Sequence, residues 1–372
     1  TKDAKFDYNG ETYNYEVVST PQGRNSTPNQ LYDKRKGYQP IGAVGNPDLG
    51  QRCEGNSSCV PICPVQAKYN ALKTLQKAVN NGTKIVSQCV ASKILYNNES
   101  GKITGIVYKE YFDDKSHNYI EKTVTAKRYV LAAHAVENAK LMLASNFMNK
   151  NIGQNLMDHP VLLTWGLAKE KIGAFRGPGS TSGIPSLRDG IFRKNRSAFR
   201  IEIGNWGWNW PTGSPDNILN DGLNQRKFGT ELRNWLLDNV QREFRLGFLI
   251  EQQALANNSV TINNQYKDHL GNHRPIINYN ITDHEKEGML AAKAFSKQFF
   301  KTIKGKDKTS YSSDKGGFIE YKGEELWWQG AGHLAGTHIM GTNKSNSVVN
   351  KEQRCHEHHN LFLVGCGNMP SM

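Results

Sequence analysis

Three cysteines lie close together in the first part of the chain: Cys53, Cys59 and Cys63. A proline follows the last of them, which gives the spacing C-x5-C-x3-C-P. Closely spaced thiolates on one loop can bind a single metal centre, and three thiolates suit a cluster of three irons in which each iron takes one protein sulfur. The spacing alone leaves two alternatives open: a zinc site, which usually has a fourth Cys or His ligand, and a disulfide with one free thiol.

The other three cysteines, Cys89, Cys355 and Cys366, are isolated in the sequence, and we expect them to be small buried residues. The alternative is that one of them is a fourth metal ligand. Residues 355–359 combine Cys and Glu with three His. Adjacent residues in a turn rarely converge on one ion, so we expect no metal site there.

A glycine-rich segment, residues 330–341, contains His333. Its glycines are spaced G-x-G-x-x-x-G and do not follow an apolar strand, so the segment fails the dinucleotide-binding fingerprint in spacing and in context. A ligand can approach an imidazole flanked by glycines closely, and histidine can gain or lose a proton near neutral pH. His333 is therefore a candidate general base, and the alternative is a histidine satisfied within a turn.

Two neighbouring indoles, Trp327 and Trp328, come a few residues before His333. We expect them to form a wall of a substrate pocket, with core packing as the alternative. Three further indoles alternate along residues 205–210, which would place them on one face of an extended strand. They could stack on a sugar or a partner subunit, or pack in the core.

Hydrophobic periodicity predicts the elements that must position these residues. Residues 1–52 read as short strands and loops. The elements predicted next are a helix at about 66–80, strands at 84–95, 105–112, 120–126 and 129–133, and a helix through Leu141 and Leu143.

From about 161 to 330 the composition shifts toward aromatic residues and glycine, which indicates a second domain. A helix with one apolar face is predicted after Thr282 and Asp283. Residues 331–372 return to small residues and a hydrophobic strand at 361–364, so we expect the chain to re-enter the first domain. The fold class is α/β and α+β.

The chain has 372 residues and a formal net charge of +13, with 47 Lys and Arg against 34 Asp and Glu. The positive charges are scattered, which argues against nucleic-acid binding. No apolar run approaches the ~18 residues that a membrane-spanning helix needs. Residues 1–10 lack the apolar core of a signal peptide.

The stretch at 333–341 resembles the H-x-x-G-T-x-x-M-G segment of the GMC family of flavin oxidoreductases. Three further stretches resemble the same family in the same order, at 131–137, 152–160 and 360–370. The cysteine spacing is similar to that of the branch containing the catalytic subunits of bacterial FAD-dependent sugar dehydrogenases of the glucose type. The resemblance extends from about residue 15 to the end.

This resemblance implies roles for individual residues. His333 would be the catalytic base, and Cys53, Cys59 and Cys63 would bind a [3Fe-4S] cluster. The residues that would contact FAD are Ala133, Glu137, Asn155, His159, Asn368 and Met369, with His134 near the flavin. For His159 and His134, the alternative is a structural role.

The resemblance also implies a GMC-like two-domain fold. Residues 1–160, with the iron–sulfur loop at 53–64, and residues 331–372 would form part of an FAD-binding domain, and residues 161–330 an antiparallel-sheet substrate domain. The family's N-terminal βαβ unit, whose G-x-G-x-x-G holds the FAD pyrophosphate, is absent from this chain. The chain also stops at Met372, before the family's second catalytic Asn or His.

The activity that the resemblance implies is oxidation of a CH–OH group of a sugar or polyol. Hydride would pass to the flavin, and electrons would leave through the [3Fe-4S] cluster to a cytochrome c subunit. A small helper subunit and a periplasmic location, peripheral to the inner membrane through partners, are further expectations. The alternatives are a non-catalytic iron–sulfur electron-transfer or metal-binding module and an oxygen-using flavin oxidase.

Overall fold

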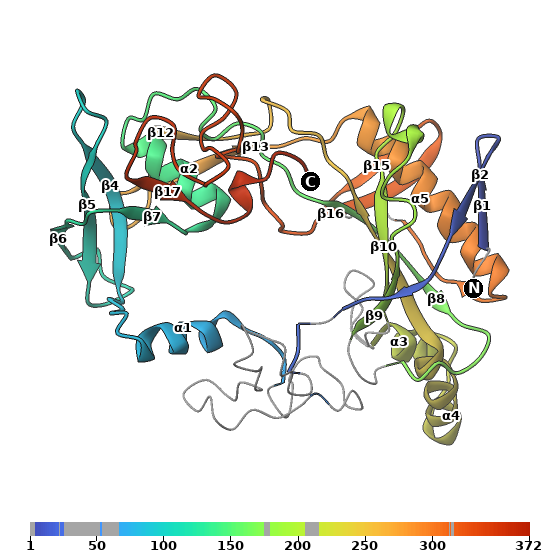
Figure 1. Ribbon diagram of the computed structural model, residues 1–372. Coiled ribbons are helices and arrows are strands. Elements are labelled where there is room, and N and C mark those ends of the chain that lie inside the picture. The colour runs from blue at the N-terminus through green and yellow to red at the C-terminus, as the bar shows by residue number, and fades with distance from the viewer. Residues whose placement is uncertain are drawn as a thin grey trace, which may run out of the picture. The chain divides into compact units, whose positions relative to one another are not determined.

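The computed structural model describes residues 4–21, 23–25, 53, 67–174, 179–204, 216–311, 313 and 316–372. The chain divides into two compact units, each built from three stretches of sequence, and the elements are labelled in Figure 1. Unit 1 comprises Thr1–Ile85, Val161–Ile250 and Lys286–Gln329, and unit 2 comprises Val86–Pro160, Glu251–Glu285 and Gly330–Met372.

Unit 1 is built around an eight-stranded sheet in the order β15-β16-β8-β11-β10-β9-β3, with β14 also paired to β8. Strand β11 pairs antiparallel with both β8 and β10, as expected for this part of the sequence. The strands are β3 (Val18–Ser19), β8 (Pro160–Leu167), β9 (Ser180–Ile184), β10 (Phe199–Gly204), β11 (Glu243–Ile250), β14 (Lys306–Asp307), β15 (Phe318–Tyr321) and β16 (Glu324–Gly330).

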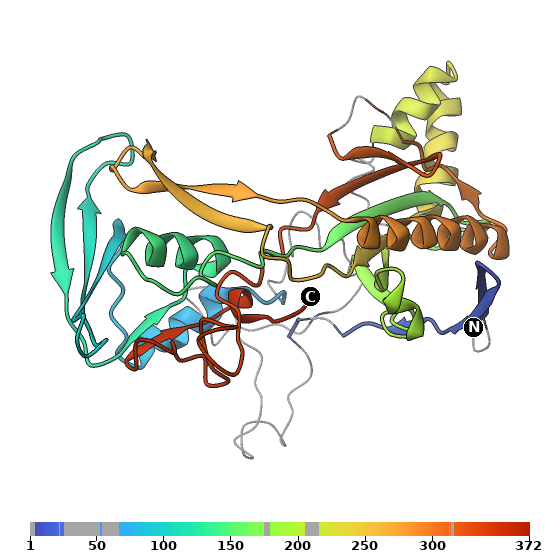
Figure 2. The same ribbon diagram turned by 90° about the horizontal axis from the view of Figure 1, so that it is seen from above.

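Helix α5 (Asp283–Thr302) lies along one face of this sheet (Figure 2). It begins with a capping box, because the backbone N–H of Thr282 donates to the Glu285 carboxylate and the Thr282 hydroxyl accepts the N–H of His284. Phe295 of α5 is buried and packs edge-on against Phe248 of β11. The apolar face predicted for this helix therefore covers the sheet.

The remaining elements of unit 1 are short. Helix α1 begins at Ala71 rather than at about residue 66, because the Asn70 side chain accepts the N–H of Leu72 and caps the helix there. These elements are β1 (Ala4–Tyr8), β2 (Glu11–Tyr15), α1 (Ala71–Asn80), η2 (Ile191–Lys194), α3 (Asp216–Asn224), α4 (Gly229–Asn239) and η3 (Val240–Arg242).

Unit 2 combines a three-stranded antiparallel sheet, a hairpin and a parallel strand pair with one main helix, α2. The sheet runs β4-β5-β6, the hairpin is β12-β13, and β7 pairs parallel with β17. The elements are β4 (Cys89–Tyr96), β5 (Ile103–Tyr111), β6 (Tyr119–Val124), β7 (Tyr129–Leu131), α2 (His134–Ala144), β12 (Ser259–Lys267), β13 (His273–Asn278), β17 (Leu361–Leu363) and η4 (Cys366–Asn368).

The core of unit 2 lies around α2, which packs against β4, β12, β13 and η4. Met142 of α2 and Val260 of β12 belong to one buried cluster. The hairpin at 259–278 therefore groups with unit 2, although the sequence expectation placed 161–330 in one domain, and residues 1–85 group with unit 1. The expected domain bounds stay a prediction.

Among the residues described, no helix combines the length and apolar character that crossing a membrane requires.

Candidate active site around His333

Two segments that the sequence analysis singled out separately lie side by side in unit 2. Residues 153–159 and 331–337 meet in an antiparallel bridge at Met157 and Ala335. The Met157 N–H donates to the Ala335 carbonyl at 3.0 Å, and the Ala335 N–H donates back at 2.9 Å. The backbone thus joins the stretch that contains His159 to the stretch that contains His333.

Asp158 fixes the backbone of both histidines. Its carboxylate is buried, with Oδ1 accepting the N–H groups of His159 and His333 at 2.8 Å each. Its Oδ2 accepts the N–H of Gly332 at 3.0 Å. A Cβ on Gly330 would lie 2.5 Å from Oδ2, so a side chain there would collide with the carboxylate. This one carboxylate therefore accepts three backbone N–H groups, two of which belong to the turn around His333.

Asp158 is itself held from behind by Gln252, which is 1% exposed. The Gln252 Oε1 accepts the Asp158 N–H at 2.8 Å and the Tyr279 hydroxyl at 2.9 Å. Burial, followed by the negative charge of Asp158, raises the pKa of Tyr279, so the phenol remains a donor. The hydrogen bonds that support the turn around His333 thus extend through Gln252 to Tyr279, the residue after β13.

The imidazoles of His159 and His333 are in contact. Their Nδ1 atoms are 3.2 Å apart, and the rings meet edge to face with an interplanar angle of 85°. His333 is exposed and His159 is half-buried. Burial and then His333 lower the pKa of His159, against the opposing effect of Asp158. An exposed imidazole on a rigid support can accept a proton from a bound hydroxyl group.

A second histidine of the same segment, His338, is completely buried and was missed by the sequence analysis. Its Nδ1–H donates to Asn368 Oδ1 at 2.5 Å, and its Nε2 accepts from Asn138 Nδ2 at 3.2 Å. Asn368 Nδ2 donates to the Leu363 carbonyl at 2.7 Å. Burial lowers the pKa of His338 to about 4. The side chain of Asn368 is thus buried and bonded to His338 and Leu363, and its contact with FAD stays a prediction.

The predicted cofactor residues of α2 lie at its first turn. Ala133 is exposed at the N-cap, and its N–H donates to Asn138 Oδ1 at 2.9 Å. His134 follows in the left-handed region with φ +73°, and Glu137 is exposed and pairs with Lys140 at 2.5 Å. The positions of these residues are open to a ligand, and their contact with FAD stays a prediction.

The other predicted site residues have different surroundings. Asn155 is half-buried with φ +60°, and Met369 is 40% exposed. Trp327 and Trp328 are half-buried on β16, which places them in unit 1, and the Trp327 indole donates to the Gly316 carbonyl at 2.8 Å. His333 belongs to unit 2, and the substrate role of the two indoles stays a prediction.

Of the three cysteines in the C-x5-C-x3-C-P motif, the structure describes Cys53, while Cys59 and Cys63 lie outside the described residues. Cys53 is a half-buried free thiol. Within the described ranges, no group of three or more His, Cys, Asp or Glu side chains could hold a metal ion. The iron–sulfur site stays a prediction.

The expectation of burial for the isolated cysteines is confirmed for Cys355 and wrong for Cys366. Cys355 is buried in the core of unit 2, which raises the pKa of its thiol to about 11. Cys366 is exposed because it begins η4, just after Gly365 turns the chain with φ +98°. Cys89 is half-buried.

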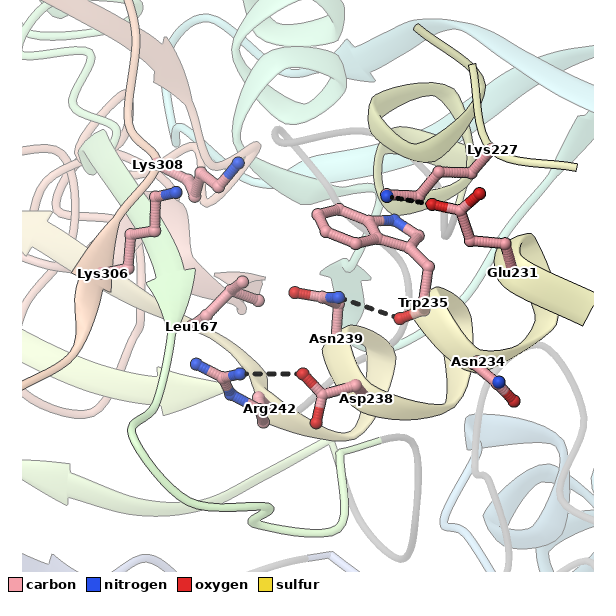
Figure 3. Close-up of a pocket in the computed structure, with 10 residues that line it drawn as sticks. All are labelled: Leu167, Lys227, Glu231, Asn234, Trp235, Asp238, Asn239, Arg242, Lys306 and Lys308. Atoms are coloured by element: carbon pink, nitrogen blue, oxygen red, sulfur yellow. Dashed lines mark hydrogen bonds and ion pairs between the residues drawn. The ribbon is translucent and has the colours of Figure 1, made fainter. Parts of the chain in front are cut away.

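Unit 1 contains a pocket of about 460 Å³ (Figure 3). It is lined by Leu167, Lys227, Glu231, Asn234, Trp235, Asp238, Asn239, Arg242, Lys306 and Lys308. Three of its four basic side chains are held in ion pairs, namely Lys227–Glu231, Arg242–Asp238 and Lys308–Asp221. None of the predicted site residues lines it, so the candidate active site remains at His333.

Comparison with known proteins identifies the family. Two models of GMC oxidoreductases match residues 27–161 and 254–372. The chain belongs to the GMC oxidoreductase family. It is 29% identical over 357 residues to the fructose dehydrogenase large subunit of Gluconobacter japonicus, a match covering 92% of this chain and 57% of that protein. It is 31% identical over 127 residues to long-chain-alcohol oxidase FAO1 of Arabidopsis thaliana, covering 32% of this chain and 17% of that protein.

Solved structures share the GMC fold. A formate oxidase from Aspergillus oryzae, studied for its FAD modification, has a TM-score of 0.54 at 15% identity, covering 82% of this chain and 59% of the other. Pyridoxine 4-oxidase from Mesorbium loti has a TM-score of 0.50 at 17% identity, covering 81% and 57%. These matches and the two sheet-containing units confirm the expected GMC-like fold.

Unit 2 offers one place that fits the FAD of a GMC protein. The parallel strands β7 and β17 lead into α2 and η4, which pack against each other. The N-cap residue Ala133 has no side chain that can accept an N–H of the first turn of α2. The carboxyl ends of parallel strands and uncapped N–H groups at a helix start favour a phosphate-bearing cofactor. Ala133 and Met369, both exposed, are the residues that would contact it.

A close backbone approach in the GMC segment gives a prediction about stability. Gly336 has φ +84°, and a Cβ there would lie 2.0 Å from the Asn155 carbonyl oxygen. Gly332 has φ +75° with nothing within 4 Å of its Cβ position. Gly336→Ala should lower the free energy of unfolding by about 3 kcal/mol or more, because strain and overpacking add.

Gly332→Ala is the matched control, because it introduces the same backbone strain without the clash. Its expected cost is about 1 kcal/mol. Urea unfolding followed by circular dichroism measures both variants. Equal costs for the two substitutions would contradict the close approach of residues 153–159 to the His333 segment.

Proposed function

We propose that this protein oxidises a CH–OH group of a sugar or polyol, with His333 as the general base and FAD as the hydride acceptor. The observation that carries the proposal is the exposed His333 on a turn clamped by buried Asp158. The match to a fructose dehydrogenase large subunit along 92% of this chain favours a sugar over other alcohols. The chain spans 57% of the length of that relative.

In this mechanism, His333 takes the proton of the substrate hydroxyl group as the adjacent C–H bond breaks. Bound FAD supplies an acceptor for the two electrons of the hydride, which no side chain could hold. Asp158 holds the backbone of His333, so the imidazole does not have to reorganise when the substrate arrives. A base within hydrogen-bond reach of the hydroxyl group contributes about 10²- to 10⁴-fold to the rate.

The test is reduction of the flavin by substrate in the absence of oxygen. Purified holoprotein would be mixed with fructose, glucose, other aldoses, polyols and primary alcohols while its flavin absorbance is followed. We expect bleaching by at least one sugar or polyol and turnover with an artificial electron acceptor. A flavin-containing preparation that only long-chain alcohols bleach, or that no alcohol bleaches, would contradict the proposed substrate class.

An oxygen-using flavin oxidase is the second candidate, because the family matches include alcohol oxidases and the similar structures include two oxidases. Hydrogen peroxide production separates the two activities. A dehydrogenase reduces the artificial acceptor with little peroxide in air, whereas an oxidase forms one peroxide for each substrate molecule oxidised.

The electron route is also a proposal: electrons leave through a [3Fe-4S] cluster on Cys53, Cys59 and Cys63 to a cytochrome c subunit. The cysteine spacing and the donor chemistry of three thiolates support the cluster. The relative from Gluconobacter japonicus is a large subunit, which supports the presence of partner subunits. A small helper subunit would be one of them. A periplasmic location, peripheral to the inner membrane, belongs to the same proposal.

Cys59→Ser should remove the iron and abolish cytochrome reduction while leaving reduction of the flavin by substrate. The reason is that three thiolates are the minimum for three irons, whereas hydride transfer does not pass through them. Iron content, the electron paramagnetic resonance signal of the oxidised cluster, and cytochrome reduction measure the effect. Cys89→Ser, at an isolated half-buried thiol, is the control, and unchanged iron in Cys59→Ser would rule out the cluster.

A further inference from the structure

The contact between His159 and His333 restricts where their protons can lie. The two Nδ1 atoms are 3.2 Å apart, which is hydrogen-bond distance. A neutral imidazole has one N–H donor and one acceptor nitrogen, so one Nδ1 must carry a proton and the other must not. The protonated nitrogen of one ring therefore determines the tautomer of the other.

Two arrangements satisfy this contact. If His159 donates from Nδ1, His333 carries its proton on Nε2 and has no lone pair to offer a substrate. If His333 donates from Nδ1, its Nε2 keeps the lone pair. Because Nδ1 of His333 is engaged by His159, Nε2 is the ring nitrogen left for a substrate hydroxyl group, and only the second arrangement gives a base.

We propose that His159 is a positioning residue that accepts the Nδ1 proton of His333 and thereby leaves the Nε2 lone pair of His333 free to take the substrate proton. This inference rests on the proposed function and assigns His159 a task besides the cofactor contact expected from the sequence. It needs His159 to be neutral. Burial and the neighbouring His333 favour that state by lowering the pKa of His159.

The shared clamp on Asp158 keeps the two rings at this distance. The same Oδ1 accepts the backbone N–H of both histidines, so neither residue can shift along the chain without losing a hydrogen bond to a buried carboxylate. The Ala331 N–H also donates to the His159 carbonyl at 3.1 Å. The pair is thus preorganised by backbone contacts that do not involve the imidazoles.

The arrangement also favours the proton transfer itself. When Nε2 of His333 takes the hydroxyl proton, the ring becomes a cation and its Nδ1–H bond to neutral His159 becomes charge-assisted, which strengthens it. The charged and titratable groups facing His159 are Asp158, which favours a cation, and His333, which disfavours a second one.

The test compares two substitutions of His159 in the holoprotein. In His159→Leu, bulk is kept and the acceptor is lost. In His159→Asn, the side-chain oxygen stands near the place of Nδ1 and can still accept. We expect flavin reduction to slow about 10- to 100-fold in His159→Leu with substrate affinity little changed, and most of that loss to be recovered in His159→Asn.

The tautomer of His333 is a second measurement, because a purely structural role of His159 would leave this tautomer unchanged. The ¹⁵N chemical shifts of the imidazole nitrogens, measured on protein labelled with ¹⁵N-histidine, distinguish protonated Nδ1 from protonated Nε2. The signals of His333 are identified because they disappear in His333→Gln. We expect protonated Nδ1 in the wild type and in His159→Asn, and a mixture in His159→Leu. Protonated Nε2 in the wild type, or an unchanged tautomer in His159→Leu, would overturn the inference.

The two proposals fail in different ways. If His333→Ala keeps its activity while the tautomer responds to His159 as expected, His333 is not the base although the pair exists. If His333→Ala is inactive while the tautomer of His333 is the same in the wild type and in the His159 variants, the assignment of His333 as the base stands. The proposed role of His159 is then wrong.

Discussion

Replacing His333 with alanine is expected to lower the rate of flavin reduction by a sugar or polyol about 10²- to 10⁴-fold. The substitution removes the ring nitrogen that, in our proposal, takes the proton of the substrate hydroxyl group. It leaves the backbone N–H of residue 333 in place to bind Asp158, so the turn should persist. Anaerobic stopped-flow measurement of the flavin band gives the rate, and its dependence on substrate concentration separates binding from chemistry.

His359→Ala is the matched control, because His359 is an exposed histidine of the same unit and is expected to have no role in the reaction. It should reduce its flavin at the wild-type rate. A His333→Ala protein with near wild-type kcat would contradict the base assignment. A slow protein with less bound flavin would instead indicate a role of His333 in cofactor binding, so flavin content must be measured alongside.

The secondary structure was predictable where a local signal sets it. Helix α5 carries its own start signal in Thr282 and Glu285 and an apolar face that repeats at helical spacing. It begins at Asp283, within one residue of the expected start. Strand β4 begins at Cys89 rather than at residue 84, because ladder pairing with β5 starts only there. Such boundaries depend on a partner strand that local sequence does not reveal.

The candidate site was predictable in part. Sequence motifs marked His333 and His159 separately, and the structure brings them into contact. Asp158 was passed over, although it stands next to His159 in the sequence, because its partners Gly332 and His333 are 174 and 175 residues away. A buried carboxylate that binds backbone N–H groups across such a distance has no periodic signature, and only its position beside a motif histidine could have indicated it.

His338 shows the same limit more sharply. It lies five residues after His333 in the glycine-rich segment 330–341, yet its partners Asn138 and Asn368 belong to α2 and η4. Both contacts exist only because these elements pack together around the core of unit 2. Nothing local separates a completely buried histidine from an exposed one in the same glycine-rich segment.

The burial of His338 is expected to make the protein acid-sensitive, with a loss of about 3 kcal/mol in the free energy of unfolding as the pH falls from 6.5 toward 4. The pKa of His338 is lowered from 6.5 to about 4 in the folded protein, so the folded state holds it neutral while the unfolded chain binds a proton. Its stabilising contribution is fully present above pH 6.5 and is lost as the pH approaches 4. Each pKa unit of difference corresponds to about 1.4 kcal/mol.

Asn368→Asp separates this contribution from those of other groups, including His159, whose lowered pKa acts with the same sign. A carboxylate at Asn368 would still accept the Nδ1–H of His338 but would favour the imidazolium, raising its pKa. Urea unfolding at intervals between pH 4 and 7 should therefore show a flatter pH dependence in this variant, at the cost of the hydrogen bond to the Leu363 carbonyl. His359→Ala should follow the wild type. An Asn368→Asp protein with the full wild-type loss would show that the acid sensitivity arises elsewhere, because the partner of the buried imidazole would then have no influence on it.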